Sequence, residues 1–169
     1  MIAFVRKLFA AILVLAGIFV VGMRRKWPPV LNAVRRASRA FKPVALKTAG
    51  SKGARTAVVR HIGRRSGRQY ETPVVAASTP DGFVIALPYG ANTDWLKNVL
   101  ASGSATVVTD GSTYAVNHPE MIAITDVETY FGPKEQRQHR RFAVVDALQV
   151  RRAAMPAEDE ANSQAATRA

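Results

Sequence analysis

The chain has 169 residues, of which 48% are hydrophobic, and its 24 Lys and Arg against 12 Asp and Glu give a net charge of +12. A chain of this length can bury one sound core and is too short for two large domains. It contains no cysteine, which excludes disulfides, thiolate metal sites and cysteine nucleophiles.

The basic charge lies mainly in the N-terminal part of the chain. Residues 1–70 contain sixteen Lys and Arg and no Asp or Glu, whereas residues 71–169 contain eight basic and twelve acidic residues. The N-terminal part is therefore expected to face an anionic lipid surface, a phosphorylated cofactor or nucleic acid. The basic residues lack interleaved aromatics, and no recognition-helix or zinc-finger pattern is present, so we predict no nucleic acid partner.

An apolar segment near the N-terminus predicts a membrane anchor. Residues 8–23 are uncharged and lie between Arg6-Lys7 and Arg24-Arg25-Lys26. As a helix this segment spans about 24 Å. That is less than the roughly 30 Å hydrocarbon core, but the flanking bases can snorkel and Trp27 suits the interface. We predict an uncleaved anchor over residues 1–27. A cleaved signal peptide is the alternative, although no clean Ala-x-Ala site precedes the bases.

The basic segment after the anchor predicts its orientation. Six bases lie within residues 24–39 and two precede the apolar run, so the positive-inside rule places the folded domain in the cytoplasm. Residues 28–45 are predicted to connect anchor and domain, with a helix over 28–42 that Pro43 ends. The apolar stripe of this helix is Val30, Leu31, Val34 and Ala37.

Residues 46–153 carry the pattern of a small antiparallel β domain. Alternating apolar residues predict strands over 54–62, 71–77, 83–87, 105–109 and 113–117. One helix is predicted over 94–100 and another over about 134–152, and residues 154–169 are predicted to form a disordered tail. Short antiparallel strands with an inserted helix predict a mainly β (α+β) fold, a small barrel rather than a doubly wound parallel sheet.

The turn Gly63-Arg64-Arg65-Ser66-Gly67-Arg68 joins the first two predicted strands. Its two glycines allow a tight backbone turn that presents three guanidinium groups together. Arginine is suited to two-pronged recognition of phosphate and carboxylate, so the turn indicates a seat for a polyanionic ligand; a solvated hairpin is the alternative. The three histidines lack metal-ligand spacing, and we predict no metal site.

Five segments of the domain follow one another at characteristic spacing: Gly63–Arg68, Thr72–Val74, Asp81–Val84, Leu87–Gly90 and Asp94–Leu100. Together they resemble the deazaflavin (F420)-dependent nitroreductase and quinone reductase family of actinobacteria. The match covers roughly residues 51–119. The resemblance implies an antiparallel split β-barrel of the flavin-binding type, coenzyme F420 as hydride carrier, and reduction of quinones or nitro compounds.

The resemblance also implies a site. By position, the implied cofactor contacts are Arg64, Arg65, Ser66, Gly67, Thr72, Pro73, Tyr89, Gly90, Trp95 and Asn98. Tyr89 and Tyr130 are expected on the substrate side, and a core or barrel-lid role is the alternative for Trp95. The loop Pro88-Tyr89-Gly90 departs from the Ser-Lys-Gly-Gly type loop of the best-known members, which removes a lysine that would face the cofactor.

The resemblance and the basic turn together predict an F420-dependent oxidoreductase at the membrane. A deazaflavin coenzyme carries a phosphate and a polyglutamate tail, which suit the arginines. Because the coenzyme supplies the hydride, we predict no catalytic side chain. The predicted partners are the coenzyme, a lipid quinone or nitro-compound acceptor, and an anionic membrane; the sequence leaves the oligomeric state open. The alternatives are a membrane-anchored protein that sequesters F420 without turnover, and a flavin mononucleotide (FMN) reductase on the same barrel.

Overall fold

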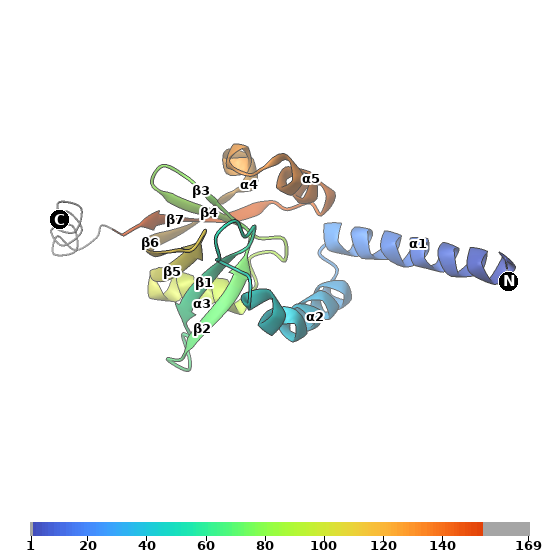
Figure 1. The fold of residues 1–169 in the computed structure, drawn as a ribbon, viewed down its shortest axis with the longest axis horizontal. Coiled ribbons are helices and arrows are strands. Elements are labelled where there is room, and N and C mark those ends of the chain that lie inside the picture. Colours follow the sequence, from blue (N-terminus) through green and yellow to red (C-terminus); the bar gives the residue numbers. More distant parts are fainter. Residues whose placement is uncertain (1, 154–169) are drawn as a thin grey trace.

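A seven-stranded antiparallel sheet is the centre of the structure, a computed structural model that describes residues 2–153 (Figure 1). The strand order is β2-β1-β5-β6-β7-β4-β3, and each neighbouring pair is antiparallel. The sheet curls into a half-barrel, which confirms the predicted mainly β fold. The predicted tail over 154–169 lies outside the described residues. The strands are β1 (Ala57–Ile62), β2 (Gln69–Val74), β3 (Ala76–Ser78), β4 (Gly82–Ala86), β5 (Ser104–Thr109), β6 (Ser112–Ala123) and β7 (Asp146–Arg152).

Helices cover the sheet and extend the chain at its N-terminal end (Figure 1). Within the described residues they are α1 (Ile2–Arg24), α2 (Pro28–Leu46), α3 (Asp94–Ser102), α4 (Ile124–Val127), the 3-10 helix η1 (Glu128–Tyr130) and α5 (Pro133–Arg141). The helix predicted over 94–100 corresponds to α3, which begins after Thr93 and ends at Gly103, a residue in the left-handed conformation typical of helix ends.

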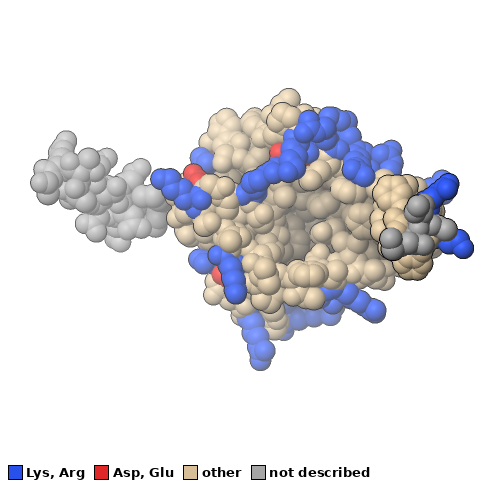
Figure 2. Space-filling view, turned by 45° about the vertical axis from the view of Figure 1, so that its right-hand side comes forward, with Lys and Arg blue, Asp and Glu red and all other residues tan. Residues whose placement is uncertain are grey.

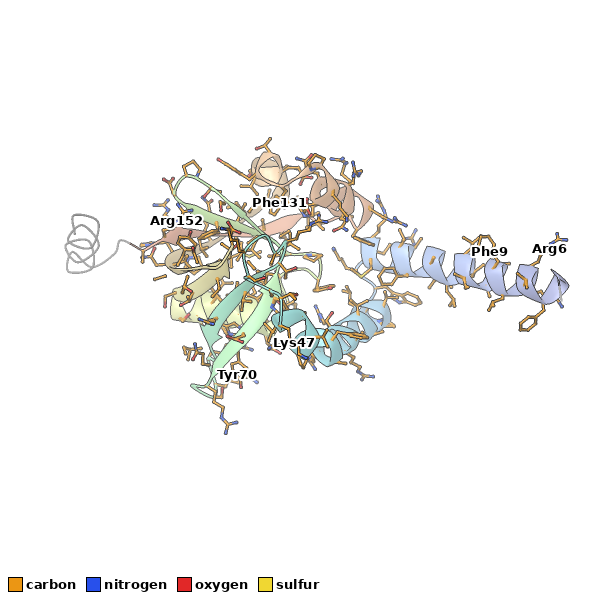
Figure 3. The ribbon with its side chains drawn as sticks, in the orientation of Figure 1. Arg6, Phe9, Lys47, Tyr70, Phe131 and Arg152 are labelled. Atoms are coloured by element: carbon orange, nitrogen blue, oxygen red, sulfur yellow. The ribbon has the colours of Figure 1, made fainter. Side chains whose placement is uncertain are left out.

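Two apolar clusters lie on opposite faces of the sheet. Phe83 and Ile85 of β4 pack in one cluster with Leu96 of α3. Val84, between them in sequence, packs in the other cluster with Phe131, which Figure 3 shows beneath the helices that follow β6. Strand β4 is therefore buried on both faces, which explains its uninterrupted apolar sequence. As a result, α3 is held firmly against one face of the sheet.

Helix α1 projects from the domain. Its residues Phe4–Arg24 are long and apolar enough to cross a membrane, with a mean hydropathy of 2.3. The side chains of residues 4–19 are exposed, as Figure 3 shows for Phe9, whereas Met23 is buried. The ring of Phe19 meets that of Phe142 edge to face at 6.0 Å. Among residues 4–24 of α1, therefore, only those near the C-terminal end pack on the rest of the structure.

Helix α2 contacts β2, and part of its predicted apolar stripe is buried. Leu31 is buried and Val34 is half-buried, while Ala37 is exposed. The prediction that Pro43 ends this helix is wrong, because α2 continues through Pro43 to Leu46. The proline removes one backbone hydrogen bond, and its exposed position leaves the freed carbonyl open to water.

The predicted helix over 134–152 is also wrong in its second half. Helix α5 ends at Arg141, and residues 146–152 form β7 between β6 and β4. Ala143 has a φ of +46°, which a continuing helix does not allow. Pairing with two neighbouring strands, together with complete burial of Leu148, overrides the local helix propensity of this segment.

Candidate functional site

The turn between β1 and β2 has a fixed backbone. The Gly63 N–H donates to the Arg68 carbonyl at 2.8 Å, and the Gly67 N–H donates to the Gly63 carbonyl at 2.8 Å. A Cβ at position 63 would lie 2.5 Å from Ser66 Oγ and 2.6 Å from the Tyr70 ring, so a larger residue there would displace these two side chains. Gly67 has a φ of +64°, which also favours glycine. The geometry of the turn therefore favours glycine at both positions.

Arg64 points back from this turn toward α3. Its Nη1 donates to Asn98 Oδ1 at 2.8 Å and to the Asp94 carbonyl at 3.3 Å, while Nη2 pairs with the Asp94 carboxylate at 3.3 Å. The Arg64 backbone N–H also donates to Asn98 Oδ1, at 3.2 Å. Part of the Arg64 hydrogen-bonding capacity thus fastens the turn to α3, and among the described residues its remaining N–H groups have no partner.

A buried polar chain continues from Asn98. Its Oδ1 accepts from Arg64, so its Nδ2 donates to Nδ1 of His61 at 3.2 Å, and the opposite ring nitrogen of His61 donates to Thr72 Oγ1 at 3.2 Å. This arrangement requires neutral His61. Burial, and to a lesser degree the charge of Lys42, lowers the pKa of His61 from 6.5 to about 4. The chain joins β1, β2 and α3 beneath the turn.

His61 predicts a specific pH dependence of stability. Because its folded-state pKa lies below its unfolded value, its contribution is complete above pH 6.5 and is lost as pH falls toward 4. Between pH 7 and 4.5 we expect a loss of roughly 2 to 3 kcal/mol in the unfolding free energy, measured by urea titration of the full chain in detergent micelles. A His61→Gln chain should lose less over this range; an equal loss would assign the effect to other groups.

The remaining polar groups of the turn face outward. The side chains of Arg65, Ser66 and Arg68 are exposed. Ser66 Oγ lies 3.1 Å from the hydroxyl of Tyr70, which supports the turn from β2. Among residues 2–153, neither the Arg65 nor the Arg68 guanidinium forms a hydrogen bond or ion pair. These two side chains are free to bind an anion.

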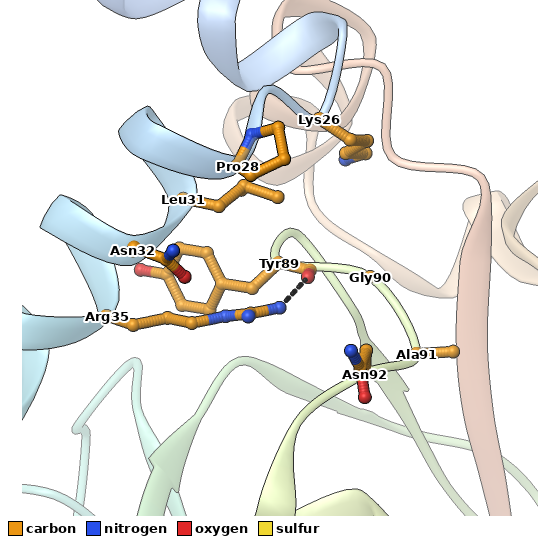
Figure 4. Close-up of a pocket in the computed structure, with 9 residues that line it drawn as sticks. All are labelled: Lys26, Pro28, Leu31, Asn32, Arg35, Tyr89, Gly90, Ala91 and Asn92. Carbon is orange, nitrogen blue, oxygen red and sulfur yellow. Dashed lines mark hydrogen bonds between the residues drawn. The ribbon is translucent and has the colours of Figure 1, made fainter.

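A pocket of about 400 Å³ lies between α2 and the loop after β4 (Figure 4). Two basic side chains fix this loop: Arg35 Nη2 donates to the Tyr89 carbonyl at 3.1 Å, and Lys26 Nζ donates to the Pro88 carbonyl at 3.1 Å. Burial lowers the pKa of Lys26, partly offset by the charge of Asp146. The lining residues are Lys26, Pro28, Leu31, Asn32, Arg35, Tyr89, Gly90, Ala91 and Asn92.

The loop before α3 connects the pocket to the residues that hold the turn. Asn92 lines the pocket, and the carboxylate of Asp94, two residues later, accepts a hydrogen bond from the Arg64 guanidinium. The Nε atom of Arg35 is buried and has no hydrogen-bond partner among the described residues. A ligand oxygen in the pocket would satisfy it, since a buried unpaired donor carries a free-energy cost.

The structure brings some of the expected site residues together and separates others. Arg64, Thr72 and Asn98 meet through His61, and Tyr89 lines the pocket with Gly90. Pro73 lies within β2, paired with Val58 of β1. Trp95 is half-buried against the α3-side apolar cluster, in line with the core role considered for it. Tyr130 belongs to η1 and is not among the residues that line the pocket.

The N-terminal segments supply a part of the site that was not predicted from the sequence. Lys26, Asn32 and Arg35 line the pocket, although the basic residues of this segment were expected only in general terms to face an anionic lipid surface, a phosphorylated cofactor or nucleic acid. No spacing in the sequence distinguishes them from the neighbouring arginines. His61 was not assigned to the site, because the three histidines lack metal-ligand spacing; its position two residues before the turn was the available signal that it supports the turn.

No family model and no curated protein matches the sequence. Among solved structures, a chain described as an F420-H2 dependent reductase is 12% identical, with a TM-score of 0.45 over 57% of this chain and 93% of that chain. A chain described as a domain-swapped dimer is 11% identical, with a TM-score of 0.46 over 57% of this chain and 79% of that chain. A protein of unknown function from Agrobacterium tumefaciens is 14% identical, with a TM-score of 0.44 over 63% of this chain and 54% of that chain. At these scores we draw no function from the likeness.

Proposed function

We propose that this chain is a membrane-anchored oxidoreductase that binds coenzyme F420 and transfers a hydride from its reduced form to a quinone or nitro acceptor. The observation that carries the proposal is the meeting of Arg64, Thr72 and Asn98 in one hydrogen-bonded chain. These residues come from three of the segments on which the resemblance rests, 34 positions apart at most. The three segments therefore form one structural unit.

The residues present fit an anionic coenzyme. Arg65 and Arg68 supply guanidinium groups for phosphate or for a polyglutamate tail, and the Ser66 hydroxyl can hydrogen-bond to a phosphate oxygen. A Cβ at Gly67 or Gly90 would meet nothing within 4 Å, so both backbone segments are open to close approach by a ligand. When bound, the coenzyme supplies the hydride, and the protein holds and orients the two reactants.

The pocket beside Tyr89 is the proposed place for the acceptor. Its wall combines the apolar Pro28 and Leu31 with donors from Lys26 and Arg35, which suits a flat molecule that carries carbonyl or nitro oxygens. The wall comes from α2 and the link that precedes it, so the pocket lies close to the end of α1. We propose that the acceptor is dissolved in the membrane and reaches the pocket from there.

Titration of the purified full chain with oxidised F420 and with FMN tests the proposed cofactor. We expect tighter binding of F420, followed by quinone-dependent oxidation of reduced F420. Tight F420 binding without oxidation by quinones or nitro compounds would favour the sequestering alternative. Tighter binding of FMN would make the chain an FMN reductase and overturn the proposal.

Anchoring predicts a difference between two kinds of acceptor. In vesicles that contain a long-chain quinone, the full chain should oxidise reduced F420 about tenfold faster than a chain shortened to begin at Arg25, because the anchor confines enzyme and acceptor to one layer. The shortened chain keeps α2 and hence the pocket wall. With a short water-soluble quinone the two rates should be equal. Equal rates with both quinones would remove the membrane-dissolved acceptor from the proposal.

A further inference from the structure

Helix α5 presents a stripe of unpaired positive charge. Lys134, Arg137 and Arg141 are exposed at spacings of three and four residues, which places them on one face of the helix. His139 is buried on the opposite side. The acidic residue of α5, Glu135, pairs with Arg55. Among the described residues, no carboxylate forms an ion pair with the three stripe residues.

The C-terminal end of α5 is fastened to the end of α1. Arg24 Nη1 donates to the Arg140 carbonyl at 2.9 Å and to the Arg141 carbonyl at 3.3 Å. Lys26 Nζ donates to the Phe142 carbonyl at 3.4 Å, and Phe142 contacts Phe19. Figure 1 shows α5 beside the end of α1, and Figure 2 shows Lys and Arg gathered along the upper part of the face turned toward α1. If α1 crosses a bilayer, these contacts place α5 at the headgroup layer.

Helix electrostatics explain only part of the stripe. Arg140 and Arg141 lie in the last turn of α5, where cations are favoured by the helix dipole. Lys134 lies in the first turn, where the dipole opposes a cation, so the helix dipole accounts neither for its position nor for that of Arg137 in the middle of the helix. Basic residues immediately next to a membrane helix are attracted to anionic headgroups.

We propose that the Lys134, Arg137 and Arg141 face of α5 binds the headgroups of anionic lipids and forms a second attachment of the domain to the membrane. The inference rests on the proposed anchoring by α1 and is independent of the cofactor. Helix α2, which follows α1 in the chain, also carries exposed basic residues, Arg36 and Arg39. One basic helix therefore follows the end of α1 in the sequence, and another contacts it. The two attachments would hold the domain in one orientation, with the pocket close to the bilayer.

A single fluorophore at Gln138→Cys, in the middle of the stripe, tests the proposal in the full chain. The sequence contains no other cysteine, so labelling is unique. The labelled chain is reconstituted into two kinds of phosphatidylcholine vesicle. One contains a small fraction of spin-labelled phosphatidylglycerol, and the other contains the same fraction of phosphatidylcholine with the same headgroup spin label. We expect quenching by the anionic lipid to exceed quenching by the zwitterionic lipid roughly threefold or more, since each base near the surface favours anionic lipid by about fivefold.

Neutralising the stripe should remove this preference. The Lys134→Gln, Arg137→Gln, Arg141→Gln chain should show a quenching ratio near one, and 0.5 M salt should lower the ratio of the unmodified chain. A chain with Lys52→Gln, Lys97→Gln and Arg151→Gln loses the same charge elsewhere on the exposed surface and should keep the preference. A ratio near one in the unmodified chain, or one unchanged by the α5 substitutions, would overturn the inference. A chain that does not float with vesicles would overturn the anchoring as well.

Discussion

Replacing Arg64 and Arg65 together by alanine is expected to weaken F420 binding by about 2 to 5 kcal/mol. The estimate assumes the loss of two charge-assisted hydrogen bonds, at roughly 1.5 to 3 kcal/mol each, with some non-additivity. In the structure the two arginines would contribute to F420 binding in different ways. Arg65 is exposed and would act on the ligand directly, whereas Arg64 also fastens the turn to α3. Affinity is measured by titrating the purified chain with oxidised F420.

The matched control for this experiment is a Lys52→Ala, Arg151→Ala chain, which loses the same charge at two exposed positions outside the turn. Its affinity should stay close to that of the unmodified chain. Added salt should weaken binding by the unmodified chain more than binding by the double variant, because screening acts on the charges that the variant has lost. Unchanged affinity in the double variant would mean that the turn is a solvated hairpin.

Asn98→Ala is expected to lower the unfolding free energy by about 2 to 4 kcal/mol. The substitution leaves a backbone N–H of Arg64 and the buried Nδ1 of His61 without the partner that Asn98 supplies, and each unsatisfied buried group costs about 1 to 3 kcal/mol. The measurement is urea unfolding of the full chain in detergent micelles at pH 7. Asn92→Ala, at an exposed position, is the matched control and should change stability by less than about 1 kcal/mol.

This experiment also decides how Asn98 serves the proposed coenzyme site. Lost stability together with weakened F420 binding is expected if Asn98 positions the turn through Arg64. Unchanged stability with abolished binding would instead make Asn98 a direct ligand contact. Asn98 is only 6% exposed, which limits such a direct contact.

The strands that the sequence predicted well are those in which the local signal agrees with the tertiary structure. The β1–β2 hairpin has alternating residues on either side of a glycine turn, and β4 has an apolar run bounded by Asp81 and Pro88. Strand β7 could not be predicted in this way, because its residues also suit a helix and follow one. Its conformation is determined by β4 and β6, which lie far from it in the sequence.

In the candidate site, too, the features set by local sequence were predicted and those set by tertiary packing were not. The glycines and arginines of the β1–β2 turn were visible as a motif, but the inward direction of Arg64 depends on Asn98, 34 residues away. The pocket wall from Lys26 and Arg35 could not be predicted, because it depends on how α2 packs against the loop after β4. Side-chain direction and the docking of one segment on another are tertiary properties that local spacing does not encode.

The central place of β7 has a consequence for how the protein is made. In the strand order, the β3–β4 hairpin joins the rest of the sheet only through β7, which is the last strand along the described chain. During translation, the ribosome must therefore release residues up to Arg152 before the two parts of the sheet can unite. Until then, one long edge of β4 stays unpaired, although its side chains are apolar on both faces. Nascent chains that stop early would therefore leave an unpaired apolar edge that can pair with other chains, so aggregation is expected from chains that lack β7.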